Sequence, residues 1–317
     1  MPQMFVSRNI HGVKDVDILS NAQKRDRNVL LMGDTGSGKT MLFSEFANQK
    51  NQKFVKIPCA ASNDPAAMFG KISPKEGAVK DNESFLEWVD GSITALIRWL
   101  NEDENNKGVL LFDEINMLQP AVQATVFPLL DKNRELVILD HNEVLKPPAG
   151  SLLIGATMNP GYRGTGVLNK AFSNRFSYTL EWDYDTVVEN ELCESQPLLE
   201  LVHTLRNSYH DGTLSTPFST NMILEFMEMF EDFGFDMAVA MISTKYNEAG
   251  DKSESDSVVQ SFNMKKDSIV NSIKRAKQRK MKKTVDTSAD LGKRTHSGFT
   301  FTHNMGWAGE EKWEKVS

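Results

Sequence analysis

Short runs of apolar residues recur over the first part of the chain and are separated by more polar segments. The runs are NVLLMG (28–33), KFVKIP (53–58), GVLLFD (108–113), SLLIGATM (151–158) and FSYTL (176–180). Several are apolar at every position rather than at alternate positions, which is typical of strands buried on both faces of a parallel sheet. The pattern therefore predicts a parallel sheet built from these runs.

Segments with helical spacing of apolar residues lie between the runs, at 40–49, 92–101 and 120–131. Strands that alternate with helices predict an α/β fold with right-handed crossover connections. Pro128 falls inside the third of these helices. We expect it to kink that helix, because proline lacks an N–H group and clashes with the preceding turn.

The pattern changes after residue 183. Strand-like runs are absent from about 184 to 249, where helical spacing occurs in PLLELVHTLRNSY (197–209) and TNMILEFMEMFEDF (220–233). The segment GDKSESDS (250–257) is polar and charged, as linkers are. We therefore predict an α/β domain over 1–183, a small α-helical domain over 184–250, and a part over 251–317 that holds a linker, a basic helix and a largely disordered tail.

The composition is ordinary for a globular protein of one large or two smaller domains, with 317 residues, 40% hydrophobic and 25% charged. The formal net charge of -7 argues against a surface built throughout to hold nucleic acid. Cys59 and Cys193 are too few for a disulfide framework or a metal site, which fits a reducing compartment. No segment resembles a signal peptide or a membrane span, so we expect a cytoplasmic protein.

The loop between the first predicted strand and the first predicted helix reads GDTGSGKT (33–40) and matches the phosphate-binding pattern G-x-x-x-x-G-K-[ST]. Gly36 and Gly38 allow backbone N–H groups to curl around the β- and γ-phosphates of a nucleotide. Lys39 supplies a cation to these phosphates, and the Thr40 hydroxyl ligates Mg²⁺. The residues predicted to bind the nucleotide are Gly33, Asp34, Thr35, Gly36, Ser37, Gly38, Lys39 and Thr40. The alternative is a glycine-rich turn that matches by chance.

Two adjacent carboxylates, Asp113 and Glu114, end the third apolar run. Ligands of open α/β sheets bind at the carboxyl ends of the strands, so both side chains are placed to reach the phosphates. Asp113 would hold Mg²⁺, directly or through water, and Glu114 would orient and polarise the attacking water. The alternative for such a pair is a solvated strand end.

Two further polar residues follow later strands. Asn159 ends the fourth run, and its amide can hydrogen-bond the γ-phosphate or the attacking water. Arg175, in LNKAFSNRFSY (168–178), can neutralise the charge that builds on the γ-phosphate oxygens if a neighbouring subunit brings it to the site. Taken singly, NPG is a turn signal and Arg175 is a surface cation.

The segments GDTGSGKT, LLFDEIN, GATMNPGY and AFSNRF, in this order and spacing, resemble the AAA+ ATPases of the MoxR type. NPGYRGTGVLNKAFSNRF (159–176) carries the most specific part of the resemblance. The CbbQ/NorQ group is the most similar, with gas-vesicle GvpN and cobaltochelatase CobS more distant. The resemblance covers 28–180 well and the helical domain loosely, and it does not reach beyond Gly250.

This resemblance implies an AAA+ P-loop NTPase fold, with a parallel-sheet nucleotide-binding domain and a helical lid. It implies ATP and Mg²⁺ as cofactors, a homo-hexameric ring, and a protein client reached through a von Willebrand factor A-domain adaptor. The segments 62–99 and 135–146 resemble the helix-2 insert and the hairpin before sensor 1, which face the central pore or the substrate. The roles that it assigns are nucleotide and metal binding for Lys39 and Thr40, metal binding and water activation for Asp113 and Glu114, sensor 1 for Asn159, and arginine finger for Arg175.

The chain departs from this family at one position. Many relatives have an arginine, sensor 2, near the start of the lid helix that corresponds to PFSTNMILEF (217–226). Here Asn221 stands in that place, and Arg206 lies on a different predicted helix. Because a cation that grips the γ-phosphate is missing from the expected position, we expect slow hydrolysis.

The segment KKDSIVNSIKRAKQRKMKK (265–283) is strongly basic. Ile269, Ile273 and Ala276 recur at helical spacing, which predicts a basic amphipathic helix that docks on an acidic partner, membrane lipid or nucleic acid. A solvated helix that balances the acidic body is the alternative. Trp307 and Trp313 follow in an apolar-poor end, where they either anchor a partner or pack back on the body.

We therefore predict an ATP hydrolase that acts as an oligomeric ring and remodels a protein client. The alternative class is a DNA-associated ATPase or a nucleotide-dependent switch that uses the basic tail as its contact. A third possibility is a chain that binds nucleotide without turnover.

Overall fold

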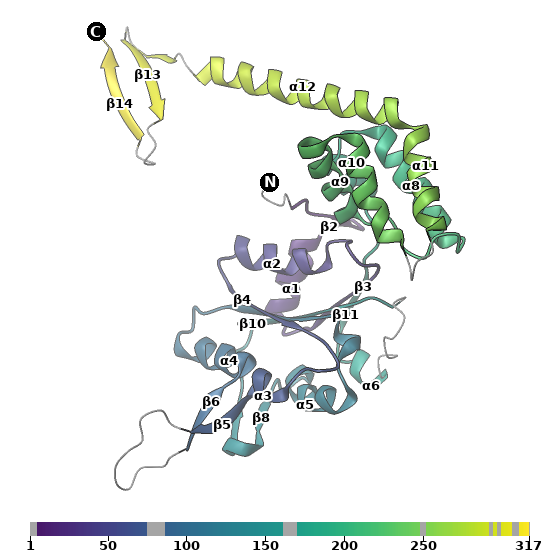
Figure 1. The fold of residues 1–317 in the computed structure, drawn as a ribbon. Helices are drawn as coiled ribbons and strands as arrows, with labels where there is room; N and C mark the ends of the chain where they lie inside the picture. The colour runs from purple at the N-terminus through teal and green to yellow at the C-terminus, as the bar shows by residue number, and fades with distance from the viewer. Residues whose placement is uncertain are drawn as a thin grey trace. The chain divides into compact units, whose positions relative to one another are not determined.

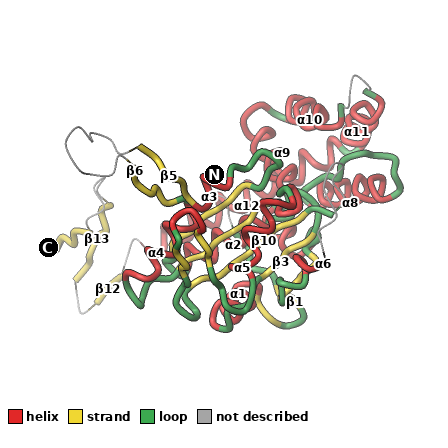
Figure 2. Tube along the Cα trace, turned by 90° about the horizontal axis from the view of Figure 1, so that it is seen from below, coloured by secondary structure: helices red, strands yellow, loops and turns green. Residues whose placement is uncertain are grey.

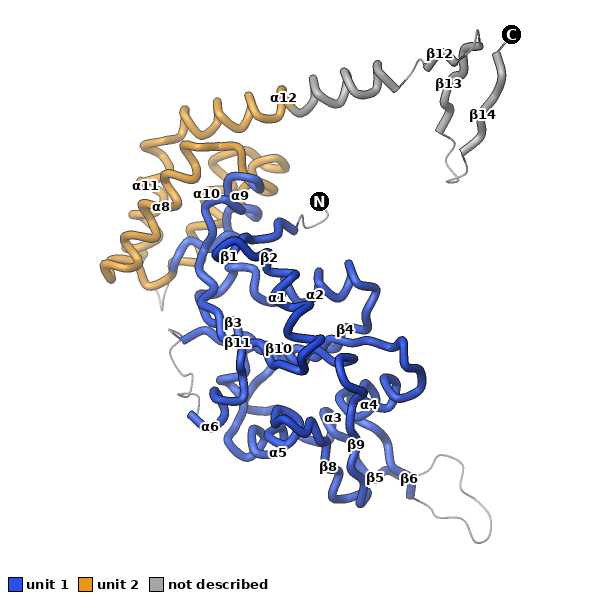
Figure 3. Tube along the Cα trace, turned by 180° about the vertical axis from the view of Figure 1, so that it is seen from behind, with its two compact units in different colours: residues 1–192, 217–225 blue, residues 193–216, 226–317 orange. Residues whose placement is uncertain are grey.

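The computed structural model describes residues 5–74, 86–160, 170–247, 252–291, 294–296, 299–305 and 311–316, with side-chain surroundings up to residue 279. The chain divides into two compact units, shown in Figure 3: Met1–Leu192 with Pro217–Glu225, and Cys193–Thr216 with Phe226–Ser317. The first unit therefore includes a short segment, 217–225, that the sequence analysis placed in the helical domain.

The first unit is built on a five-stranded parallel sheet, visible edge-on in Figure 1. Its strand order is β11-β3-β10-β7-β4. The strands are β3 (Val29–Met32), β4 (Lys53–Pro58), β7 (Gly108–Asp113), β10 (Leu152–Met158) and β11 (Tyr178–Glu181). Each strand comes from one of the predicted apolar runs, so the predicted α/β fold with a parallel sheet is confirmed.

Helices cover both faces of this sheet (Figures 1 and 2). Alternate residues of one strand point to opposite faces, and the two apolar cores follow this alternation. Val109 and Leu111 of β7 belong to the core under α1 and α2, whereas Leu110 and Phe112 belong to the core under α4 and α5. The helices of the first unit are α1 (Asp15–Lys24), α2 (Lys39–Gln49), α3 (Pro65–Phe69), α4 (Ser92–Glu102), α5 (Pro120–Leu130), α6 (Lys170–Ser173) and α7 (Thr186–Leu192). Because the central strands β3, β7 and β10 are covered on both sides, every one of their positions can be apolar, whereas the edge strands β4 and β11 are partly exposed.

Two antiparallel hairpins project from this unit. They are β5 (Gly70–Pro74) with β6 (Leu86–Asp90), and β8 (Leu136–Ile138) with β9 (Glu143–Leu145). Arg98 of α4 links them: its Nε lies 2.8 Å from Asp90 Oδ2, and its Nη1 donates to Glu143 Oε1 at 2.9 Å. Because one guanidinium binds both hairpins, the two hairpins are held to each other.

The second unit is helical. Its helices are α8 (Gln196–His210), α10 (Phe235–Ser243), α11 (Ser253–Met264) and α12 (Lys266–Leu291), together with the end of α9 (Thr220–Phe233). The ring of Phe262 lies 5.1 Å from that of Phe226 and 6.3 Å from that of Phe235, between ring centroids. The predicted linker 250–257 is shorter than expected, because α11 begins at Ser253. The first residues of α11 are polar, so the sequence pattern does not indicate that Val258 and Phe262 are fully buried, one turn apart in this helix.

Residues 266–283 of the basic segment lie on α12, and Lys265 caps the end of α11. Ile269 and Ile273 are buried, as the apolar spacing predicts. Three of its lysines pair with acidic residues of the same unit: Lys265 with Glu200, Lys266 with Asp236, and Lys277 with Glu231. These pairs favour a helix that balances the acidic body.

Three short antiparallel strands follow α12, namely β12 (Arg294–His296), β13 (Phe299–Met305) and β14 (Glu311–Val316). The sequence predicts a largely disordered tail over this part of the chain, whereas the structure has three strands there. Their β-branched and aromatic residues favour extended backbone. Trp307 lies outside the described residues, and Trp313 belongs to β14. A membrane-spanning helix is not found in the part of the chain that the structure describes.

Candidate functional site

The glycine-rich loop connects β3 to α2 at the carboxyl edge of the sheet. Gly36 and Gly38 have φ angles of 74° and 90°, a left-handed conformation that glycine adopts at no steric cost. A Cβ on Gly33 would lie 2.1 Å from the carbonyl oxygen of Trp182, and one on Gly36 would lie 2.7 Å from the Cβ of Ser219. The loop therefore needs glycine both for its backbone turn and for the close approach of neighbouring chain.

This loop forms one wall of a cavity of about 400 Å³. The cavity also receives the residues that end β7 and β10, as expected for strands whose carboxyl ends meet at one edge. Its lining residues are Thr35, Gly36, Gly38, Lys39, Thr40, Met41, Ser44, Asp113, Glu114, Thr157, Asn159 and Asn221. The structure thus brings together the predicted loop, both predicted carboxylates and the predicted amide.

Lys39 begins α2 and is only 9% exposed. Its Nζ donates to the carbonyl oxygens of Gly33 and Asp34, at 2.7 Å each. Burial lowers the pKa of Lys39, although the nearby carboxylates of Asp34, Asp113 and Glu114 act in the opposite direction. A cation held in this way has lost part of its hydration, so a phosphate gains more from meeting it than from meeting an exposed lysine.

Asp113 lies at the centre of a hydrogen-bonded cluster. Its Oδ1 accepts from the hydroxyls of Thr40 and Thr157, at 2.7 Å each. Its Oδ2 lies 3.5 Å from Nζ of Lys56, on the neighbouring strand β4. Hydroxyl and carboxylate oxygens are the protein ligands that Mg²⁺ prefers, and those of Thr40 and Asp113 face the same cavity. These residues therefore fit a magnesium ion shared with bound phosphates.

Glu114 has an unusual backbone conformation. Its φ is 60°, in the left-handed region that costs a non-glycine residue on the order of 1–3 kcal/mol. Its N–H donates to Thr157 Oγ1 at 2.9 Å, and its carbonyl accepts from Met117 N at 2.9 Å. The side chain is exposed and lines the cavity. The fold thus holds this carboxylate at the cavity against a local strain.

Asn159 connects β10 to the glycine-rich loop. Its Nδ2 donates to Thr35 Oγ1 at 2.9 Å, and its carbonyl oxygen accepts from Asn116 Nδ2 at 3.2 Å. The amide therefore lies against the loop that would hold the phosphates.

Arg175 does not line the cavity. Its Nε lies 2.7 Å from Asp131 Oδ1, its Nη1 donates to the carbonyl of Ala171 at 2.6 Å, and its guanidinium lies 4.5 Å from the centre of the Phe127 ring. Asn28, the residue before β3, donates a 2.8 Å hydrogen bond to the carbonyl of Arg175. The glycine-rich loop follows the other end of β3. Arg175 therefore lies near the amino ends of the strands, whereas the cavity lies at their carboxyl ends.

A second, more apolar cavity adjoins the first. It shares Gly36, Gly38, Met41 and Asn221 with it, and its other lining residues are Phe5, Val6, Arg8, Ser37, Trp182, Val188, Leu192, Thr220 and Leu224. The Asn221 N–H donates to the Gly36 carbonyl at 3.4 Å. Asn221, which the sequence places in the sensor 2 position, therefore lies beside the loop and lines both cavities.

The sequence does not predict a role at the site for four residues near these cavities. Arg8 stacks on Trp182 at 4.2 Å and donates to the carbonyls of Ser37 and Asp183. Tyr184 donates to the Thr35 carbonyl at 2.9 Å. Thr157 and Lys56 contact Asp113 as described. Thr157 stands two residues before Asn159, but its contact with Asp113 depends on the order of the strands, and nothing in the sequence marks Arg8, Tyr184 or Lys56.

Residues 28–176 match the family model described as the AAA domain of the dynein-related subfamily. This segment contains the glycine-rich loop, Asp113, Glu114, Asn159 and Arg175. The matched segment is thus similar to an AAA domain of that subfamily, and it lies within an α/β unit whose sheet is parallel and five-stranded.

Individual proteins are similar over about the same part of the chain. Midasin of Dictyostelium discoideum is 31% identical over 172 residues, which are 54% of this chain and 3% of midasin. An uncharacterized protein of Staphylococcus aureus (strain USA300) is 31% identical over 176 residues, 55% of this chain and 63% of that protein. The chain thus spans less than two thirds of either relative. A crystal structure of a candidate ATPase from Cytophaga hutchinsonii has a TM-score of 0.40 and 15% identity, covering 73% of this chain and 71% of that chain.

Proposed function

We propose that this chain binds ATP with Mg²⁺ and hydrolyses it. One observation carries this proposal: a single cavity at the carboxyl edge of the sheet gathers a buried lysine, a hydroxyl–carboxylate pair and an exposed carboxylate. The match of residues 28–176 to an AAA domain supports the same reaction.

The residues of this cavity have separate roles in phosphoryl transfer. Lys39 and the loop N–H groups bind the β- and γ-phosphates, and Thr40 and Asp113 hold the metal. When bound, Mg²⁺ neutralises charge on the phosphates. Glu114 orients and polarises the attacking water, and Asn159 fixes the water or the γ-phosphate from the other side. The flat base of the nucleotide packs against the apolar residues of the second cavity.

Arg175 supplies the missing cation, in our proposal, to the cavity of a neighbouring copy. Its own cavity lies at the other end of the strands, and among the residues that the structure describes Lys39 is the one cation that lines that cavity. A closed ring, which we propose to be a hexamer, gives every cavity an arginine. With Asn221 in the sensor 2 position, hydrolysis depends more strongly on Arg175 than it would if an arginine stood in that position.

The ring acts on a protein client in the manner of the MoxR type, which includes the CbbQ/NorQ group that the sequence resembles. We propose a von Willebrand factor A-domain protein as the adaptor, on the resemblance alone. The two hairpins joined by Arg98 support a contact with the client, because they expose Ile72, Leu86, Val137, Leu139 and Val144. Cys59 and Cys193 are buried, and neither belongs to a disulfide, which suits a cytoplasmic location.

A DNA-associated ATPase or a nucleotide switch is the second candidate, carried by the basic segment of α12. The ion pairs of Lys265, Lys266 and Lys277 weaken it, because these charges already have acidic partners in the same unit.

Phosphate release from ATP by the wild-type chain and by Glu114→Gln tests the hydrolase. Pull-down with Glu114→Gln in ATP tests the client, because blocked hydrolysis should trap the engaged state. Recovery of a von Willebrand factor A-domain protein is expected. Recovery of nucleic acid alone, with binding that falls steeply with salt, would favour the second candidate.

A further inference from the structure

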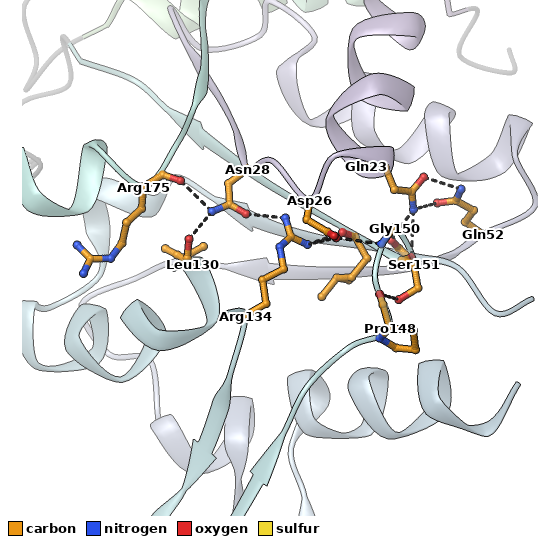
Figure 4. Close-up of polar contacts among 12 residues, drawn as sticks. Gln23, Asp26, Asn28, Gln52, Leu130, Arg134, Pro148, Gly150, Ser151 and Arg175 are labelled. Atoms are coloured by element: carbon orange, nitrogen blue, oxygen red, sulfur yellow. Dashed lines mark hydrogen bonds and ion pairs between the residues drawn. The ribbon is translucent and has the colours of Figure 1, made fainter. Parts of the chain in front are cut away.

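A buried arginine, Arg134, binds the residue that precedes β3, and Figure 4 shows its contacts. Arg134 is 4% exposed and has a left-handed φ of 51°. Its Nη1 donates to the carbonyl of Leu152 at 2.6 Å and its Nη2 donates to Asn28 Oδ1 at 2.9 Å. Asp26 lies 3.6 Å from Nη1 and balances its charge. Burying a guanidinium is costly, and no proposed step of hydrolysis uses this one.

The arginine determines how the side chain of Asn28 is oriented. A guanidinium only donates hydrogen bonds, so the oxygen of the Asn28 amide must face Arg134 and its nitrogen must face away. The nitrogen donates to two backbone carbonyls, those of Leu130 and Arg175, at 2.8 Å each. With Asn28 only 3% exposed, water does not compete for these bonds.

The two carbonyls belong to the two sides of one ion pair. Leu130 precedes Asp131, and Asp131 binds the guanidinium of Arg175. A single oriented amide therefore fixes the backbone on both sides of the Arg175–Asp131 pair. Asn28 is also the residue that precedes β3, and its carbonyl accepts from the N–H of Tyr178 at 3.2 Å. The anchor of Arg175 is thus part of the central sheet.

We propose that Asn28, oriented by Arg134, is a positioning residue that sets where Arg175 is presented to a neighbouring copy. This inference rests on the proposed function, in which Arg175 completes the cavity of the next subunit. Loss of the amide leaves ATP binding intact, because the glycine-rich loop lies beyond the other end of β3. Catalysis suffers, because misplacement of a catalytic group by about 1 Å lowers the rate by about a hundredfold.

The first test is steady-state ATP hydrolysis by Asn28→Ala in the full chain. We expect kcat to fall by about a hundredfold with an unchanged KM. Gln23→Ala is a matched control, because Gln23 is a buried amide (5% exposed) that donates to the carbonyls of Gly108 and Ser151, away from Arg175. Thermal melting checks that both variants are folded. An unchanged kcat for Asn28→Ala, or an equal loss for Gln23→Ala, would overturn the proposal.

The second test separates positioning from general damage by mixing subunits. Glu114→Gln subunits have an intact Arg175, and Arg175→Ala subunits have an intact cavity, so together they should regain turnover. Adding Asn28→Ala to the Glu114→Gln subunit should abolish this rescue. Adding it to the Arg175→Ala subunit should not, because that subunit contributes only its cavity. Equal effects on both sides would mean a structural role and would refute positioning.

Failure of the proposed function gives a different result. If Glu114→Gln fails to rescue Arg175→Ala in assemblies shown by native mass spectrometry to be mixed, Arg175 does not act between subunits, and the positioning role falls with it. Arg134→Lys provides a second variant that keeps the buried charge. It loses the fixed fork of donors, so we expect the same one-sided defect in smaller size. Normal rescue by folded Arg134→Lys, Glu114→Gln subunits would exclude Arg134 from this role.

Discussion

Thr40 and Asp113 are 73 positions apart in the chain, and the hydroxyl of Thr40 donates to Asp113 Oδ1 at 2.7 Å. Thr40 comes from the start of α2 and Asp113 from the end of β7, so neither can take this place without the sheet. Thr157 of β10 binds the same oxygen at 2.7 Å. Three elements, α2, β7 and β10, therefore bring together the hydroxyl and carboxylate oxygens that we propose to hold Mg²⁺.

The first prediction concerns Lys39. Lys39→Ala should abolish tight ATP binding, since the phosphates lose a cation that the fold has already desolvated. Isothermal titration calorimetry with ATP and Mg²⁺ measures this. Lys50→Ala, at the exposed end of the same helix, should bind as the wild type does. Retained binding by Lys39→Ala would mean that the loop amides alone hold the phosphates.

The second prediction is a pH dependence of binding. Burial lowers the pKa of Lys39, and only its charged form attracts phosphate. Affinity should therefore fall as the pH rises through this lowered pKa, by about tenfold per pH unit, and at lower pH than an exposed lysine would give. Bound phosphate favours the charged form, so the loss should level off above the pKa of the complex. Lys39→Arg keeps its charge, and titrations between neutral and alkaline pH should show no such loss.

The third prediction separates binding from turnover. Glu114→Gln should keep ATP affinity and lose hydrolysis, because the amide cannot polarise water but the phosphate contacts persist. Glu102→Gln, in the exposed last position of α4, is the control and should hydrolyse normally. Wild-type turnover by Glu114→Gln would assign water activation to another group.

The sequence predicts the sheet well because its three central strands are buried on both faces. Continuous apolar runs mark β3, β7 and β10, and the polar residues after them mark the cavity. Thr157 and Lys56 were missed, because their importance depends on strand order. β7 lies between β4 and β10, and only this order brings both side chains to Asp113.

The start of α11 was misjudged for another reason. SESDS is polar, and nothing local indicates that Phe262 will pack against Phe226 and Phe235. Tertiary contacts decide this helix, and one sequence does not reveal them. Arg8 is a similar case, since its partner Trp182 lies far along the chain.

The fourth prediction concerns stability. Gly155 of β10 is buried, and a Cβ there would lie 2.2 Å from Cε1 of Phe43. Phe43 is fully buried and cannot move away freely, so Gly155→Ala should destabilise the chain by about 1–3 kcal/mol. Phe43→Leu makes room, and adding it to Gly155→Ala should recover part of the loss. Urea unfolding of the three variants measures this, and a fully stable Gly155→Ala would show that the core repacks.

The fifth prediction concerns Arg175 itself. Arg175→Ala should bind ATP normally, because the side chain lies outside the cavity, against Asp131 and Phe127. Turnover should fall by a factor on the order of a thousand or more, the size of other arginine-finger effects. Lys170→Ala, an exposed cation five residues earlier, should leave turnover unchanged. If dilution below the assembly concentration lowers wild-type turnover to the level of Arg175→Ala, the arginine acts between copies. Turnover that is independent of concentration in a monomeric wild-type chain would contradict this role.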